Sequence, residues 1–151
     1  MAVISCPFDL PVGRLLALDL GQVRHGVAVC DQTGTLATPL TVLRRHDTRA
    51  ADFIEVQALV NRHQAKGVLV GLPLQTEDRA GGQARWVLRY AGRLAGTLSV
   101  PVAFWDESLS SHDAAALVGR RPGESLDAAA AALILQDFLE ARRLKHDAED
   151  P

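Results

Sequence analysis

The chain has 151 residues, which is enough for one domain with a full core and too few for two large lobes. Its composition, 48% hydrophobic and 23% charged, is ordinary for a globular protein. The net charge of −2 gives no sign of a strongly basic nucleic-acid-binding protein, and no apolar stretch is long enough to span a membrane.

The N-terminal stretch MAVISCPFDLPVG has neither the basic start nor the continuous apolar run of a signal peptide. The two cysteines, Cys6 and Cys30, have no spacing typical of metal or redox chemistry. We therefore expect a cytoplasmic protein with free thiols. We divide the chain into an N-terminal extension at 1–13, one domain at 14–144 and an acidic tail at 145–151.

Three strands are predicted at the start of the domain, at 15–20, 25–31 and 35–43. Gly21 ends the first strand, and the turn signal DQTG separates the second from the third. Connections this short favour an antiparallel meander of the three strands.

Three longer helices are predicted further along, at 48–63, 81–98 and 126–143. In the first, Ala51, Ile54, Leu59 and Val60 recur close to helical spacing. A short helix is also predicted at 110–118, where Ser110 or Ser111 suits the N-cap.

Two strands alternate with these helices. The run GVLVGLP is continuously apolar, which is typical of a strand buried on both faces, and VPVAFWDE forms the last strand. The order is βββαβαβ followed by helices. It predicts an α/β fold with one mixed five-stranded sheet, three antiparallel strands plus two parallel, and helices on both faces.

Acidic residues stand at the ends of these elements. Asp19 ends the first strand, Asp106 and Glu107 end the last, and Asp127 opens the final helix on the stripe that carries the apolar residues. Such a sheet is expected to carry its site beyond the carboxyl ends of adjacent strands.

Gathered carboxylates repel one another unless a cation lies among them, and oxygen-only ligand sets favour Mg²⁺ or Mn²⁺ over zinc. We therefore interpret Asp19 as a metal ligand. Taken singly, Asp19 also suits a turn and Asp127 a partner of the helix dipole. The combination with the fold order favours the metal site.

Four stretches together resemble one family: LALDLGQVRHGVAVCD, GVLVGLPLQTEDRAGGQARWVLRYAGRL, VPVAFWDESLSS and SLDAAAAALILQDFL. They resemble the YqgF/RuvX family, a branch of the RNase H-like superfamily described as pre-16S rRNA nucleases and Holliday junction resolvase-like proteins. The likeness runs from about Arg14 to Arg142, and four such stretches in order are specific where one would be weak.

By position, the resemblance implies that the family's catalytic, metal-binding triad falls on Asp19, Glu107 and Asp127. It also implies an RNase H-like fold and two Mg²⁺ or Mn²⁺ ions. Ser108 stands where such proteins usually carry an arginine, and the loop before Asp127 is cut to GRRPGES. These departures bear on substrate geometry more than on metal binding.

Basic residues suggest where nucleic acid binds. Arg24 and His25 follow the first strand, and either a phosphate contact or a plain surface hairpin fits the residues alone; the resemblance favours a role for Arg24 and leaves His25 open.

Arginines also recur four residues apart along the second helix, beside two aromatic residues on the next stripe. That pattern suits phosphate contact and base stacking, and a solvated arginine face explains it as well. The arginines are Arg85, Arg89 and Arg93, and the aromatic residues are Trp86 and Tyr90.

The leading hypothesis is a metal-dependent nuclease that hydrolyses phosphodiesters in structured nucleic acid, resembling the nuclease that processes the 5′ end of pre-16S rRNA. One alternative is a Holliday junction resolvase on branched DNA, which needs two active sites and hence a homodimer. Another is a non-catalytic nucleic-acid-binding module. The pattern DLG…GVAV also resembles the first phosphate loop of sugar kinases and actin-like ATPases, but their fold closes two domains over the nucleotide and this chain supplies one.

Overall fold

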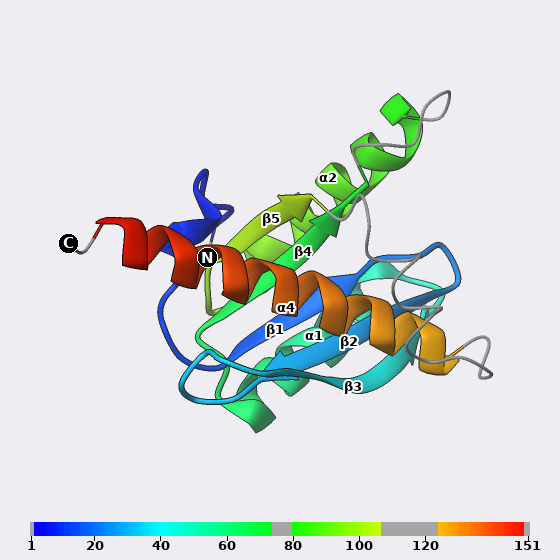
Figure 1. Cartoon of the computed structure of the whole chain (residues 1–151). Helices are drawn as coiled ribbons and strands as arrows, with labels where there is room; N and C mark the ends of the chain where they lie inside the picture. Colours follow the sequence, from blue (N-terminus) through cyan, green and yellow to red (C-terminus); the bar gives the residue numbers. More distant parts are fainter. Residues whose placement is uncertain (1, 74–79, 107–123, 150–151) are drawn as a thin grey trace.

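A mixed five-stranded sheet lies at the centre of the computed structural model, which describes residues 2–73, 80–106 and 124–149 (Figure 1). Its strand order is β3-β2-β1-β4-β5. β2 pairs antiparallel with β1 and β3, whereas β4 pairs parallel with β1 and β5, as the order of elements predicts. The strands are β1 (Leu15–Asp19), β2 (Arg24–Cys30), β3 (Ala37–Arg44), β4 (Gly67–Leu72) and β5 (Val102–Asp106).

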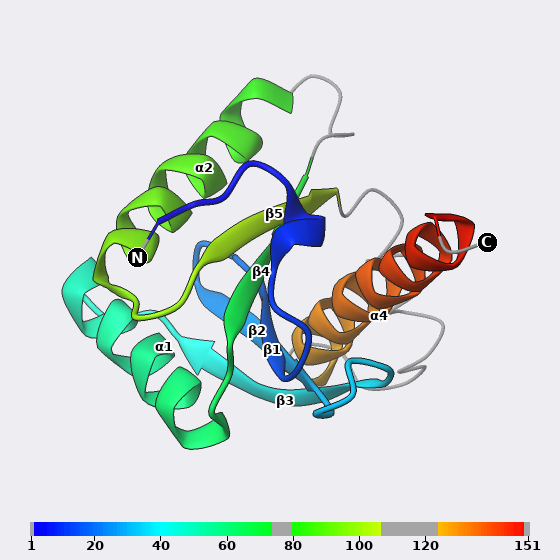
Figure 2. The same cartoon turned by 90° about the vertical axis from the view of Figure 1, so that its left-hand side faces the viewer.

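Helices cover both faces of the sheet. Figure 2 shows α1 (Arg49–His63) and α2 (Ala80–Thr97) on one face and α4 (Glu124–Glu149) on the other. Side chains alternate along β1, so that Leu16 and Leu18 pack in the core with α1 and α2, while Leu15 and Ala17 pack in the core with α4. The central strand β4 is buried on both faces, as its continuous apolar run predicts. The helix predicted at 110–118 lies outside the described residues.

The N-terminal segment packs against the last strand of the sheet. The N–H of Ile4 donates to the carbonyl of Val102, and the N–H of Val102 donates to the carbonyl of Ala2. A short 3-10 helix, η1 (Pro7–Asp9), follows, and its Phe8 stacks on Phe138 of α4. Residues 2–10 thus cover the β5 edge, which an open sheet would otherwise leave unpaired.

α4 is longer than predicted. It continues to Glu149, so that residues 145–149, expected as part of a tail, are helical. An ion pair between Lys145 and Glu149, four residues apart, stabilises this last turn, and no glycine or proline interrupts the helix before Pro151. None of the described helices is long and apolar enough to cross a membrane.

In α1 the prediction of the buried face is wrong at Ile54, whose side chain is 70% exposed. The buried positions of this helix instead include Asp52, Phe53 and Val56. A carboxylate therefore lies where an apolar residue was expected, which is possible only because it is fully hydrogen-bonded, as described below.

The start of α4 touches β2 backbone to backbone. A Cβ atom added to Gly26 would lie 1.9 Å from the carbonyl oxygen of Asp127 and 3.0 Å from the N of Ala128. Only glycine at position 26 lets the helix approach this closely.

Replacing Gly26 by alanine is expected to lower the free energy of unfolding by about 1–3 kcal/mol, because the new methyl group forces α4 away from β2. Urea denaturation measures the effect. The matched control is Gly92→Ala in α2, where a Cβ meets nothing within 4 Å and which should raise stability by about 0.5–1 kcal/mol. Equal stability of the two variants would refute the close contact.

Candidate functional site

Asp19 and Asp127 lie on either side of Gly26, at the edge of the sheet where β1 ends. Asp19 is the register partner of Gly26 in the β1–β2 pair, and it shares the α4 side of β1 with Leu15 and Ala17. The backbone of Asp127 covers Gly26 from the same side. The structure therefore brings together two of the predicted metal ligands, one from a strand end and one from the start of α4.

Arg24, the first residue of β2, pairs with one of these carboxylates. Its Nε donates to Oδ2 of Asp127 at 2.5 Å, and both side chains are 32% exposed. A guanidinium carries five N–H donors, so this bond leaves others for a phosphate oxygen. Arg24 thus lies beside Asp127.

The third predicted acid, Glu107, lies outside the described residues. Asp106, directly before it, is exposed at the end of β5. β1 and β5 both run parallel to β4, so their carboxyl ends point to the same edge of the sheet. Across 2–73, 80–106 and 124–149, no three His, Cys, Asp or Glu side chains form a group that could hold a metal ion.

The two described acids fit a hard divalent cation. Both offer only carboxylate oxygens, which are the ligands that Mg²⁺ and Mn²⁺ prefer. Asp127 already accepts a hydrogen bond from the Arg24 guanidinium, which fixes the orientation of its carboxylate. Residues Asp19 and Asp127 could therefore hold such an ion together with a third acid.

His25 does not join the acids, because it points to the opposite face of the sheet and is 1% exposed. The backbone N–H of Gly21 donates to its Nδ1 at 3.1 Å, so Nδ1 carries no proton. The proton of the neutral ring is therefore on Nε2, which donates to the Tyr90 hydroxyl at 2.9 Å. That hydroxyl in turn donates to Oδ2 of Asp52, also at 2.9 Å.

Asp52 ends this chain of hydrogen bonds as a carboxylate. It also accepts from the His46 N–H at 2.7 Å and from Nε of Arg45 at 3.2 Å. Burial opposes its ionisation, but the His46 N–H, the Tyr90 hydroxyl and Arg45 outweigh that effect and hold its pKa below the ordinary value. Burial, followed by the Asp52 carboxylate, raises the pKa of Tyr90 well above its usual range.

Burial also dominates at His25 and lowers its pKa to about 4, although the Asp52 charge acts in the opposite direction. At neutral pH the network therefore holds a neutral histidine, a neutral tyrosine and one carboxylate. Its effect on the site is positional, because the hydrogen bond from Gly21 to His25 fixes the turn directly after Asp19. Asp19 itself is half-buried.

The arginines of α2 are exposed, whereas one of its two aromatic residues is buried. Arg85, Arg89 and Arg93 are all exposed. Tyr90 is buried in the network, so the prediction that it stacks on a base is wrong. Trp86 is half-buried, with its ring stacked on Tyr90 at 5.2 Å between centroids.

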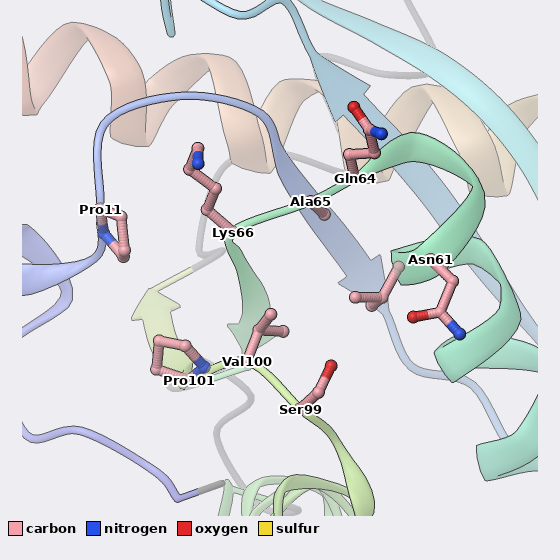
Figure 3. A pocket seen from close by; sticks show the side chains of 9 residues that line it. Pro11, Asn61, Gln64, Ala65, Lys66, Ser99, Val100 and Pro101 are labelled. Atoms are coloured by element: carbon pink, nitrogen blue, oxygen red, sulfur yellow. The ribbon is translucent and has the colours of Figure 1, made fainter.

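Two hollows flank the α1 face. One, of about 460 Å³, lies where α1 begins, and we call it the arginine pocket. It is lined by Arg45, Asp47, Thr48, Arg49, Trp86, Arg89 and Tyr90. The other, of about 600 Å³, lies where α1 ends and β4 begins, and Lys66 is the one charged residue among those that line it (Figure 3). It is remote from the edge that carries the acids, so we assign it no part in the site.

Comparison with known proteins identifies the family of the chain. A family model described as RuvX, Holliday junction resolvase, matches residues 13–141. The chain belongs to the RuvX family. A protein of Trichormus variabilis named "Putative pre-16S rRNA nuclease" is 40% identical over 135 residues, which are 85% of this chain and 88% of that protein. A protein of Chloroflexus aurantiacus with the same name is 39% identical over 135 residues, with the same coverage. The predicted resemblance is thus confirmed.

Among solved structures, this RuvX-family chain is similar to Thermus thermophilus RuvC in complex with a Holliday junction substrate. The TM-score is 0.56 at 18% identity, over 87% of this chain and 96% of that chain. A second structure of Thermus thermophilus RuvC gives a TM-score of 0.54 at 17% identity, over 86% of this chain and 96% of that chain. At such identities the likeness shows the fold alone. This likeness confirms the predicted RNase H-like fold.

Sequence reasoning misses the network of His25, Tyr90 and Asp52 in this RuvX-family chain. A signal for it exists in α1, because Asp52 stands four residues before Val56 and seven before Leu59, both buried. A carboxylate on the apolar stripe of a helix predicts a buried polar partner, and the partner had to come from another element.

Because the pKa of His25 is about 4 in the folded protein and 6.5 in the unfolded chain, the unfolded state takes up a proton first as pH falls. The contribution of neutral His25 is therefore complete above pH 6.5 and is lost between pH 6.5 and about 4. It amounts to about 3 kcal/mol. Urea denaturation at several pH values should show a shallower fall in this window for His25→Leu than for the unmodified protein.

His46 provides the control, because its hydrogen bond to Glu55 raises its pKa. Its contribution has the opposite sign and is present below pH 6.5, so His46→Leu should lose stability relative to the unmodified protein as the solution is acidified. Parallel pH curves for His25→Leu and the unmodified protein would contradict the assigned state of His25.

Proposed function

We propose that the chain is a metal-dependent nuclease that hydrolyses phosphodiester bonds in structured nucleic acid. The observation that carries this proposal is the convergence of Asp19 and Asp127 around Gly26, with Arg24 paired to Asp127. Family membership supports it, because the matching family model and the curated relatives carry the names of nucleases. We assign the activity to residues 14–144.

In this proposal Asp19, Glu107 and Asp127 are the catalytic residues and hold two Mg²⁺ or Mn²⁺ ions. When bound, such ions lower the pKa of a water molecule that acts as nucleophile and stabilise the leaving oxygen of the phosphodiester. Arg24 orients the Asp127 carboxylate through its Nε, and its remaining N–H groups can donate to a phosphate oxygen. The His25 network holds the turn after Asp19 and takes no proton from the substrate.

The substrate that the relatives' names favour is the precursor of 16S rRNA, which would place the protein in the cytoplasm. The description of the matching family model favours a second candidate, a Holliday junction. Symmetric cleavage of a junction needs two active sites and therefore a homodimer, whereas trimming one rRNA end does not. Side-by-side cleavage of a pre-16S rRNA fragment and a four-way DNA junction distinguishes the two, and binding without cleavage of either would indicate a non-catalytic module.

Asp19→Asn is expected to abolish cleavage, because it removes a ligand charge from the metal site. The metal-free variant should be at least as stable as the unmodified protein, since the change removes one of two neighbouring negative charges. Cleavage is measured with added Mg²⁺ or Mn²⁺ and stability by thermal unfolding in a chelator. Normal cleavage by the variant would show that Asp19 is not a required metal ligand. A metal-free variant that unfolds far more easily than the unmodified protein would make Asp19 a structural residue.

Replacing Arg85, Arg89 and Arg93 together by alanine is expected to weaken binding to every nucleic-acid sequence by a similar factor. If each contacts a phosphate, the slope of log affinity against log salt should become shallower by about 2–3 units. Binding is titrated at several salt concentrations with Ca²⁺ in place of the active metal. Arg143→Ala, an exposed arginine on α4, is the control, and an identical slope for both proteins would make the α2 arginines a solvated face.

A further inference from the structure

The arginine pocket lies on the far side of the β1–β2 turn from the acids. Its Arg45 is tied to that turn by two hydrogen bonds, from its backbone N to the Val23 carbonyl at 3.0 Å and from Nη1 to the Gln22 carbonyl at 3.3 Å. The same turn joins Asp19 to Arg24. The acidic site and the arginine pocket are therefore connected through this one turn.

The charge of the pocket is positive. Arg45 is balanced by Asp52, its ion-pair partner at 3.2 Å. Arg49 and Arg89 also line the pocket, both are exposed, and neither side chain has a hydrogen bond or ion pair within the described part of the chain. Against these two cations stands one carboxylate, Asp47. Two guanidinium groups that have no side-chain partner among the described residues, on a concave surface, suit a phosphate.

The pocket also has an aromatic wall. Trp86 is half-buried and is held in place by its stacking on Tyr90 and by the guanidinium of Arg45, 5.4 Å from the ring centroid. Tyr90 is fixed in turn by the hydrogen bonds to His25 and Asp52. A tryptophan ring fixed before binding is suited to contact a nucleobase, because little side-chain entropy remains to be lost.

The geometry points to the arginine pocket as a subsite for one nucleotide of the substrate strand, with Arg49 and Arg89 on its phosphate and Trp86 against its base. This assignment rests on the proposed function, since it supplies a second anchor for the strand that the acids are to cut. The volume of about 460 Å³ is in the range of small-ligand sites. The chemistry selects a phosphate attached to a planar base over an inorganic anion.

The test uses the fluorescence of Trp86. The chain has two tryptophans, so the variant Trp105→Phe leaves Trp86 as the single reporter. This protein is titrated with a short single-stranded oligonucleotide and, separately, with sodium phosphate, in Ca²⁺. The oligonucleotide should quench Trp86 at far lower concentration than phosphate does. Adding Arg49→Ala should weaken oligonucleotide binding by about tenfold and reduce the salt slope by about 1 unit.

The matched control is Arg62→Ala, which removes an exposed arginine in the last turn of α1. It should change neither the affinity for the oligonucleotide nor the salt slope. If Arg49→Ala and Arg62→Ala bind alike, or if phosphate quenches as well as the oligonucleotide does, the nucleotide subsite is refuted. Cleavage is assayed on the same proteins. A quench that depends on Arg49 in a protein that cuts no substrate would uphold the subsite and refute the nuclease; cleavage without dependence on Arg49 would do the reverse.

Discussion

The contact between the Asp127 carbonyl and Gly26 is the constraint on which the site depends. It sets the distance of α4 from β2 at the edge where β1 ends, and with it the position of the Asp127 carboxylate beside Arg24 and Asp19. The other end of α4 is held separately, by the packing of Phe138 on Phe8 and Trp105 and by the hydrogen bond from Arg142 to the Leu10 carbonyl. A long helix anchored at both ends cannot slide along the sheet, so its carboxylate remains in register with a strand that is distant in sequence.

The turn between β1 and β2 separates two different electrostatic environments. On the α4 side, the described carboxylates Asp19 and Asp127 lie near Arg24 and remain partly exposed. On the α1 side, every polar group of the network has a partner, and among the described residues no buried side-chain N or O atom lacks a hydrogen bond. A rigid support, whose one carboxylate is paired with Arg45, thus lies on the other side of the turn from a charged site and holds that turn in place.

The sequence predicts those parts of the fold and of the candidate site whose pattern lies within one helix, strand or turn. The five strands and three helices follow from apolar period and turn residues, and the placement of Asp127 toward the sheet follows from its stripe on α4. The exposure of Ile54 does not follow from the sequence, because it depends on tertiary contacts. The end of α4 has a local signal that the prediction overlooks, the Lys145–Glu149 ion pair in a stretch without glycine or proline. The partnership of His25 with Tyr90 spans 65 positions in the chain, and no periodicity within one element can reveal it.

The network also constrains how the chain can change over evolutionary time. Loss of Asp52 alone would remove the shared acceptor of the Tyr90 hydroxyl, the His46 N–H and the Arg45 guanidinium. Loss of His25 alone would leave the Gly21 N–H without its hydrogen-bond acceptor. Converting this core to an apolar one requires several of these positions to change. Each protein with only one of them changed is less stable than both the present protein and the fully apolar variant. His25, Tyr90 and Asp52 should therefore be inherited or replaced together. A lineage that has acquired all three is expected to keep a polar core on this face of the sheet.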